Sequence, residues 1–599
     1  MWAFLTEEKG ALARAGCRKG NSTFYIPADG PDSQTIKPSG ASAERHSFLQ
    51  YALLHFRDDH PPNCEPTTSA KTLGANSMRG TIKILDYLTG GRRKSRTGLQ
   101  DWTWKELTDK VKYSPFPIVT SLLKFDSDYL NRLAVDSFTA IMRFMGDLPL
   151  GLHQKEVECV YTILVICHHH PQLRDELYCQ IMKQTTNNKS LNLESGIRGW
   201  RLLAFLAAFF KCSTSLMPYL MKYLETAAQD LRRIEHATAD VCMKNLKQTT
   251  TYGGRRNVPT ETEVNAIIEG KFNRMQDYFL PGGVQLNIPT SSSTVVEDII
   301  LTVGRKMGIK NETEFLEFSL YCIVEGDQYT MPLERDEYIL DLVAELERNG
   351  STYYLVFCRS VWCFPSRLDS ELYIEIIFHQ IIPDYLEGYL LIKPSNCSTF
   401  SPGTWDMLLK IATLMHKAKG MNSLPNKSDM MYLLPKPAMN FYTEITKNWA
   451  ETLLNEWQHT VPLNAMEAKA QCIEILQKWS LFGSCFFGAK MLDVNSDLEE
   501  EFIIAVNKTG INVLHIQTHE TLWRFNFAAA NAPDNVVSIN GTKYADVVFG
   551  DTNVKKTLRL QVDHAHEVLR LITQYELIQK EQKEKEDVQL SYPRVMIKV

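Results

Sequence analysis

Three apolar patterns at helical spacing, all between residues 130 and 210, constrain the fold of this chain most. In the block 130–145, apolar residues recur at steps of three and four until a glycine and a proline stop the pattern. The block 173–185 has a second apolar stripe, and the block 199–210 is apolar nearly all round, as in a helix covered by its neighbours. We expect the charged residues of the second block to face solvent: Arg174, Asp175, Glu176 and Lys183. Together the blocks predict the core of a helical bundle.

Within these blocks, three motifs follow one another at wide separations. They read MRFMGDLP at 142–149, RDELYCQIMKQ at 174–184 and GWRLL at 199–203. In this order they resemble the signature segments of the myosin tail homology 4 (MyTH4) domain. The resemblance implies an all-α bundle at 45–265. Residues 1–44 are rich in Gly, Ser, Pro and Asp without a sustained period, so they are predicted to be a mostly irregular leader.

Length and composition bound the class of protein. A chain of 599 residues should form several domains, and its 44% hydrophobic and 23% charged residues are usual for a globular protein. The net charge of -5 gives no argument for nucleic acid binding. Thirteen scattered cysteines without a CxxC pair indicate a reducing cytosol. No signal peptide opens the chain, and its longest apolar run is far shorter than the ~20 residues that a bilayer requires. These features predict a cytoplasmic protein without a transmembrane segment.

A polar insertion near 60–112 interrupts the predicted bundle and contains a basic cluster. The cluster consists of Arg92, Arg93, Lys94 and Arg96. One interpretation is a solvated surface segment. The other is an electrostatic contact for an acidic partner such as the microtubule surface, which salt would weaken. The resemblance to MyTH4 adds support to the second interpretation, although the cluster lies outside the matching motifs.

After residue 266 the pattern changes, and three segments follow. Residues 266–360 predict a hairpin, a helix that opens at a capping box beginning with Thr294, a strand, a short helix and a last strand, as in ubiquitin. Residues 361–481 are mainly helical. Residues 482–586 predict strands from 501 onward and one long final helix, as in a pleckstrin-homology-like sandwich. Lobes of these three kinds in this order resemble a FERM domain with an acyl-CoA-binding-protein-like second lobe, so the predicted class is multidomain α+β.

A MyTH4 bundle followed by a FERM domain resembles the tail of an unconventional myosin, most like class XV, then class VII or X. The resemblance implies a cytoskeletal, cargo-binding protein of actin-rich protrusions such as stereocilia and filopodia. It also implies a groove for cargo peptides between a strand and the final helix of the third lobe. Transferred by element order, the residues of this groove are Val536, Val537, Ser538, Ile539, His564, Val568, Leu571 and Tyr575. Ordinary core packing is the alternative for each of them, and it is favoured for Val568 and Leu571.

The tail at 587–599 ends with apolar residues at Ile597 and Val599. This spacing suits a PDZ ligand, in which the terminal carboxylate is held by backbone N–H groups and two side chains enter pockets. The alternative is an apolar tail without a partner.

No catalytic motif is present: the sequence has no G-x-x-x-x-G-K-[ST], G-x-G-x-x-G, G-x-S-x-G or H-E-x-x-H pattern. The run Cys167 to His170 lacks the ligand spacing of a zinc site. We therefore expect no enzymatic activity, no cofactor and no metal. The partners would be protein cargo peptides and a PDZ scaffold, with a motor domain, and F-actin through it, if the chain is part of a longer one. A motor-free cytoskeletal adaptor and a microtubule-binding module remain as alternatives.

Overall fold

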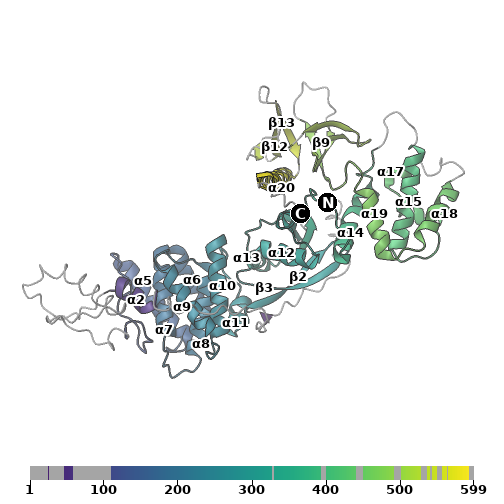
Figure 1. Ribbon diagram of the computed structural model, residues 1–599. Coiled ribbons are helices and arrows are strands. Elements are labelled where there is room, and N and C mark those ends of the chain that lie inside the picture. Colours follow the sequence, from purple (N-terminus) through teal and green to yellow (C-terminus); the bar gives the residue numbers. More distant parts are fainter. Residues whose placement is uncertain are drawn as a thin grey trace, which may run out of the picture.

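The fold was described from a computed structural model. The residues it describes are 24–25, 46–57, 109–326, 330–392, 400–439, 449–491, 501–525, 527, 536–539, 542–549, 556–562 and 564–591. Figure 1 shows a helical bundle beside three further lobes, with the first lobe in the middle. This arrangement confirms the predicted multidomain α+β class.

The bundle buries the three blocks singled out in the sequence. Its long helices begin and end where the sequence indicates: Ser127 caps the first by accepting the Leu130 N–H, and Gly146 ends it in the left-handed conformation with a φ of 79°. The helix that contains GWRLL is buried on almost every side. The elements are α2 (Phe48–His55), α5 (Asp128–Met145), α6 (Glu156–His169), η1 (Pro171–Leu173), α7 (Arg174–Thr185), α8 (Ser195–Phe209), α9 (Met217–Gln229), α10 (His236–Tyr252) and α11 (Glu261–Ile268).

The first lobe has the predicted ubiquitin-like order. Its elements are β2 (Asn273–Leu280), β3 (Val284–Ser291), α12 (Val296–Lys306), η2 (Glu312–Glu317), β4 (Phe318–Val324), β5 (Thr330–Pro332), α13 (Ile339–Arg348) and β6 (Tyr353–Arg359). Strand β2 pairs with β3 on one side and with β6 on the other, and β6 continues through β4 to β5. A two-residue strand of the leader, β1 (Phe24–Tyr25), also pairs with β2, so the leader is not wholly irregular.

The helix cap expected at Thr294 lies one residue later. Val295 occupies the N-cap position of α12, and its N–H is accepted by the carboxylate of Asp298 at 3.0 Å. The Thr294 hydroxyl instead accepts the N–H of Ser291 at 2.9 Å. Thr294 therefore closes the turn before the helix rather than the helix itself.

The second lobe is helical and the third is a sheet covered by one helix. The helices of the second lobe are α14 (Glu371–Glu387), α15 (Pro402–Ala418), α16 (Lys427–Met430), α17 (Lys436–Met439), α18 (Trp449–Thr460) and α19 (Ala465–Leu476). The third lobe contains β7 (Cys485–Met491), β8 (Glu501–Asn507), β9 (Gly510–His515), β10 (Thr521–Phe525), β11 (Val536–Ile539), β12 (Thr542–Phe549), β13 (Lys556–Val562) and α20 (Ala565–Ser591). The sheet order is β10-β9-β8-β7-β13-β12-β11, so β7, which the sequence pattern missed, is its central strand.

Three apolar cores hold these parts together. One lies within the bundle, and a second runs from the helices of the first lobe into the second lobe. The third joins the opposite face of the first-lobe sheet, including Tyr321 and Val356, to the sheet and helix of the third lobe. The first lobe therefore contacts both other lobes. None of the described helices combines the length and apolar character needed to cross a membrane.

Candidate partner-binding surfaces

A buried ion-pair cluster joins the bundle to the first lobe. Arg255, which follows the last long bundle helix, has a side chain with 0% exposure and pairs with Glu263 of α11. Its Nε also lies 2.7 Å from Oδ1 of Asp341 on α13, in the first lobe. The guanidinium lies 4.6 Å from the ring centroid of Phe209. One arginine thus neutralises a carboxylate from each side of the joint.

Further contacts close the same joint. The Tyr338 hydroxyl donates to the Gly253 carbonyl at 2.5 Å, and the Ser293 hydroxyl of the first lobe donates to Oδ1 of Asn245 on α10 at 2.7 Å. A Cβ added at Gly254 would lie 1.8 Å from the carbonyl oxygen of Phe209, so only glycine allows this close approach. These contacts favour a fixed arrangement of the bundle and the first lobe.

The polar face of α7 differs from the sequence expectation. Glu176 and Lys183 are buried instead of facing solvent. The Glu176 carboxylate accepts the backbone N–H groups of Leu122 and Leu123, both at 2.7 Å, and an amide N–H of Gln180 at 2.9 Å. Burial raises the pKa of the Glu176 carboxyl, although these hydrogen bonds oppose the shift. The face therefore binds another segment of the chain.

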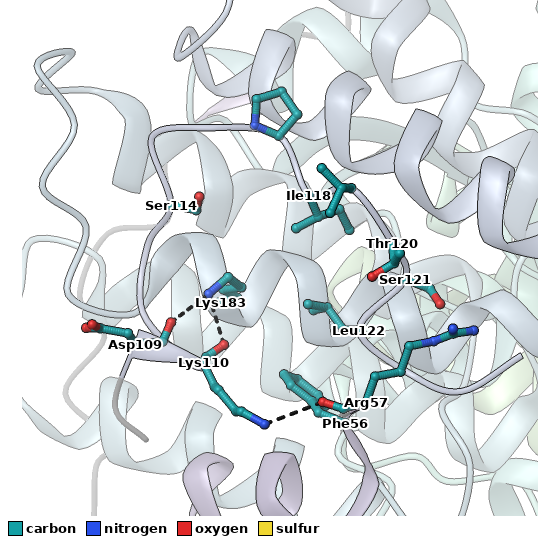
Figure 2. A pocket seen from close by; sticks show the side chains of 12 residues that line it. Phe56, Arg57, Asp109, Lys110, Ser114, Ile118, Thr120, Ser121, Leu122 and Lys183 are labelled. Carbon is teal, nitrogen blue, oxygen red and sulfur yellow. Dashed lines mark hydrogen bonds between the residues drawn. The ribbon is translucent and has the colours of Figure 1, made fainter. Parts of the chain in front are cut away.

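Lys183 holds the segment that precedes those leucines. Its ammonium donates to the carbonyl oxygens of Asp109, Lys110 and Lys112 at 2.8–2.9 Å. Figure 2 shows Lys183 at the wall of a pocket of about 460 Å³. The pocket is lined by Phe56, Arg57, Asp109, Lys110, Ser114, Pro117, Ile118, Val119, Thr120, Ser121, Leu122 and Lys183. The RDELYCQIMKQ motif thus serves to anchor the segment 109–123 beside this pocket.

On the strand side of the predicted third-lobe groove, Val536, Val537, Ser538 and Ile539 form β11. This strand pairs with β12 and lies at an edge of the described sheet. The structure describes the strand but not the side chains of these four residues. Main-chain groups at such an edge can pair with an added strand.

The helix side of the groove is placed differently. Val568, Leu571 and Tyr575 are at most 1% exposed and lie in the core shared by the first and third lobes. The Tyr575 hydroxyl accepts the Trp362 N–H at 3.2 Å, and its ring stacks on Phe527 with centroids 5.1 Å apart. Core packing, the alternative given for these residues, is what the structure shows. His564, directly before α20, is half-buried.

The flanks of α20 divide between the first lobe and open surface. Arg570 bonds to Tyr321 and Glu567, and Gln574 bonds to the Leu316 carbonyl, so this flank lies against the first lobe. Because an α-helix turns by about 100° per residue, Leu569 and Glu576 lie on the flank of α20 opposite to that of Arg570 and Gln574. Both are half-buried, and burial raises the pKa of Glu576. The transfer by element order missed them because three of the helix residues that it named lie on the face of α20 that packs in the core.

The remaining predicted sites lie outside the described residues. These are the basic cluster Arg92, Arg93, Lys94 and Arg96, and the terminal Ile597 and Val599. Within the described part of the chain, no group of three or more His, Cys, Asp or Glu is placed to hold a metal ion. There Cys167 is buried in the bundle, whereas His168 and His169 are exposed.

Comparisons with known proteins agree with this architecture. Residues 160–266 match the MyTH4 domain family. Human unconventional myosin-XV is 30% identical over 485 residues, which are 81% of this chain and 14% of that protein. Human unconventional myosin-XVB is 29% identical over 470 residues, which are 78% of this chain and 14% of that protein. This chain therefore spans about one seventh of either relative.

A solved structure has the same fold. It is the human myosin 7b C-terminal MyTH4-FERM domain in complex with the harmonin-a PDZ3 domain. The TM-score is 0.56 at 21% identity, and the match covers 87% of this chain and 98% of that one. Residues 160–266 thus match a MyTH4 domain, the chain has the MyTH4–FERM fold, and its predicted resemblance to unconventional myosin tails, most like class XV, is confirmed.

Proposed function

We propose that the chain is a non-catalytic, cargo-binding tail segment of an unconventional, actin-based myosin. The joint at Arg255 is the observation that carries this proposal, because it links the bundle to the first lobe through buried charges. Surfaces on the two parts are then presented to a partner in one geometry, which reduces the entropy lost on binding. The motor domain, and F-actin through it, would belong to other parts of a longer chain.

The proposed domain bounds follow the sequence pattern. They are 45–265 for the MyTH4 bundle, 266–360, 361–481 and 482–586 for the three FERM lobes, and 587–599 for the tail. The protein would act in the cytoplasm, at the cytoskeleton of actin-rich protrusions. Similarity to class XV myosins supports this location.

Two partner sites are proposed. In the first, Ile597 and Val599 enter the pockets of a PDZ domain, and the PDZ complex of the human myosin 7b tandem supports this mode. In the second, a cargo peptide adds to β11 and contacts α20. The side chains offered by the helix would be His564, Leu569 and Glu576 rather than the buried Val568, Leu571 and Tyr575.

The PDZ site is tested by direct binding. The full chain and a chain ending at Met596 are titrated with purified harmonin-a PDZ3, and the affinity is measured by isothermal titration calorimetry. We expect binding by the full chain only, because the shortened chain loses both apolar anchors. Equal affinity of the two chains would overturn the terminal ligand.

The groove is tested with a matched pair of variants. Leu569→Asp places a charge on the open flank of α20, whereas Leu454→Asp changes an exposed leucine of α18 in the second lobe. Cargo captured by the third lobe should be lost with Leu569→Asp and kept with Leu454→Asp. Equal capture by both variants would exclude the open flank as the binding surface.

The two alternatives are a microtubule-binding module, which rests on the basic cluster, and a motor-free adaptor. A microtubule-binding module would co-sediment with microtubules at low salt and be released as salt rises, because exposed charges are screened. Exchange of Arg92, Arg93, Lys94 and Arg96 for glutamine should abolish that binding. A motor-free adaptor would be indicated if no transcript joined this chain to a motor domain.

A further inference from the structure

Six large aliphatic side chains are exposed together at one end of the helical bundle. Five of them have exposed fractions between 78% and 102%, and the sixth is 38% exposed. They are Leu152, Leu191, Leu193, Leu231 and Ile234, with Leu150 as the sixth, and we call this set the apolar end. They lie on three loops: the α5–α6 loop, the α7–α8 loop and the α9–α10 loop.

Side-chain hydrogen bonds bring the first two loops together. The carboxylate of Asp147, after α5, accepts the hydroxyl of Ser190 on one oxygen and that of Ser195 on the other, the latter at 3.0 Å. The Asn192 side-chain amide donates to the Met145 carbonyl at 3.1 Å. Leu191 and Leu193, on either side of Asn192, are therefore held outward by a defined loop conformation.

Two further contacts place all three loops around the start of α8. Arg198 of α8 pairs with Glu156, at the start of α6, with an Nη1–Oε1 distance of 2.6 Å. A Cβ built on Gly196 would lie 3.6 Å from Oε1 of Glu235, in the α9–α10 loop. The six aliphatic side chains thus share one end of the bundle.

The size of the apolar end matches half of a protein interface. Burying an aliphatic side chain contributes about 1.5–3 kcal/mol, at about 25 cal/mol per Å² of apolar surface. Each such residue therefore buries roughly 60–120 Å² of apolar surface, and six of them bury roughly 400–700 Å². Isolated monomers rarely expose an apolar patch larger than roughly 300–600 Å². A stable interface buries roughly 800 Å² on each partner, which the apolar end and its polar rim can supply.

The charges on these loops are balanced. The loops at 146–155, 187–195 and 230–235 contain four acidic and four basic residues, and their net charge is zero. The acidic residues are Asp147, Glu194, Asp230 and Glu235, and the basic residues are Lys155, Lys189, Arg232 and Arg233. An acidic lipid surface or the acidic microtubule surface would select a net positive face. A balanced apolar face is complementary to a second copy of itself, as a two-fold symmetric interface requires.

We propose that the apolar end is the contact face of a dimer formed by two copies of this chain. The two copies meet end to end around a two-fold axis, with the six aliphatic side chains of each at the centre. Charged residues of both signs form the rim. The third-lobe groove remains open for cargo in both copies, because the apolar end belongs to the bundle alone.

The association is measured by sedimentation equilibrium of the full chain at roughly 1–100 µM, a range that covers micromolar affinities. The weight-average mass should rise with concentration from the 68.5 kDa of one chain toward twice that value. It should rise equally in 0.5 M salt, since burial of apolar surface drives it. A constant monomer mass, or association that is lost in high salt, would overturn the proposal.

Variants locate the contact. Leu191→Glu with Leu193→Glu should weaken association at least about tenfold, and so should Leu231→Glu with Ile234→Glu on another loop. The control, Leu454→Glu, changes a leucine of α18 that is 47% exposed and should associate like the wild type. All variants should melt like the wild type, because the replaced side chains make few native contacts. Unchanged association in both double variants, or an equal loss in the control, would exclude the apolar end.

Discussion

Replacing Arg255 with methionine tests the joint between the bundle and the first lobe. The arginine side chain has 0% exposure, and those of its partners Glu263 and Asp341 are 3% and 11% exposed. Methionine fills similar volume but leaves two carboxylates without their counter-charge. Breaking a buried pair in this way costs about 3–5 kcal/mol, because the remaining charge is desolvated and uncompensated. We expect a loss of unfolding free energy in that range.

The assay combines urea unfolding with hydrogen–deuterium exchange. Exchange should accelerate in α11 and at the start of α13, on the two sides of the joint. Adding Glu263→Gln and Asp341→Asn to Arg255→Met should restore part of the stability, since no charge then remains buried. As a surface control, Lys155→Met removes an ion pair with Glu261 whose side chains are 68% and 57% exposed, and it should change stability by less than about 0.5 kcal/mol.

Two results would refute this reasoning. One is an Arg255→Met chain whose stability and exchange match those of the wild type. The other is a triple variant that is less stable than Arg255→Met alone. In either case the buried charges would not hold the two parts together.

Three further predictions concern single residues. Lys183→Met removes the ammonium that donates to three carbonyl oxygens of the segment 109–123. The free energy of unfolding should fall by about 1–3 kcal/mol, and proteolysis of this segment should accelerate. Unchanged proteolysis would contradict this. Burial raises the pKa of the Glu176 carboxyl in the folded chain. At pH values between the unfolded and the folded pKa, the folded chain therefore keeps a proton that the unfolded chain has lost. Its unfolding free energy should then fall as pH rises from about 4.3 through the folded pKa, and a Glu176→Gln chain with the same pH dependence would disprove this. Gly254→Ala should lower the melting temperature, because the new Cβ would meet the Phe209 carbonyl. The control Gly403→Ala should not, because no atom lies within 4 Å of its new Cβ. Equal melting temperatures of the two variants would count against the close approach.

Periodicity predicted the elements that bury an apolar stripe on a single face. It identified α5, the β2–β3 hairpin and the long final helix, because their patterns repeat over many residues. The helix α8 was predicted from a different signal, an apolar character nearly all round. It did not find β7, in which strand residues at Cys485–Met491 follow directly on a turn and the pattern is short. The order of lobes, which carried the family resemblance, depended only on these longer patterns.

Polar residues were harder to place than apolar ones. Glu176 and Lys183 look like solvent-facing charges of a helix, yet the backbone groups that they bind lie 53 or more residues away in sequence. The same holds for Arg255 and Asp341, which are 86 residues apart. Spacing within one helix contains no information about such partners, so the sequence could not reveal which charges are buried.

The predicted groove shows a related limit. The family resemblance, transferred by element order, named Val568, Leu571 and Tyr575 as groove residues, and the structure buries all three in the core. A peptide site on the same helix must use the residues that flank these three. A helical projection identifies those flanks, but the contacts of Arg570 and Gln574 with the first lobe are needed to show which flank remains open.

The most direct test of the account uses the full chain as bait in a cytosolic extract. It is compared with the chain ending at Met596 and with the Leu569→Asp chain, and bound proteins are identified by quantitative mass spectrometry. We expect a reproducible set of protein partners, with PDZ scaffolds lost from the truncated bait and cargo lost from the Leu569→Asp bait. If no protein is enriched over a bait of unrelated fold, the chain is not a cargo-binding tail, and the central claim is contradicted.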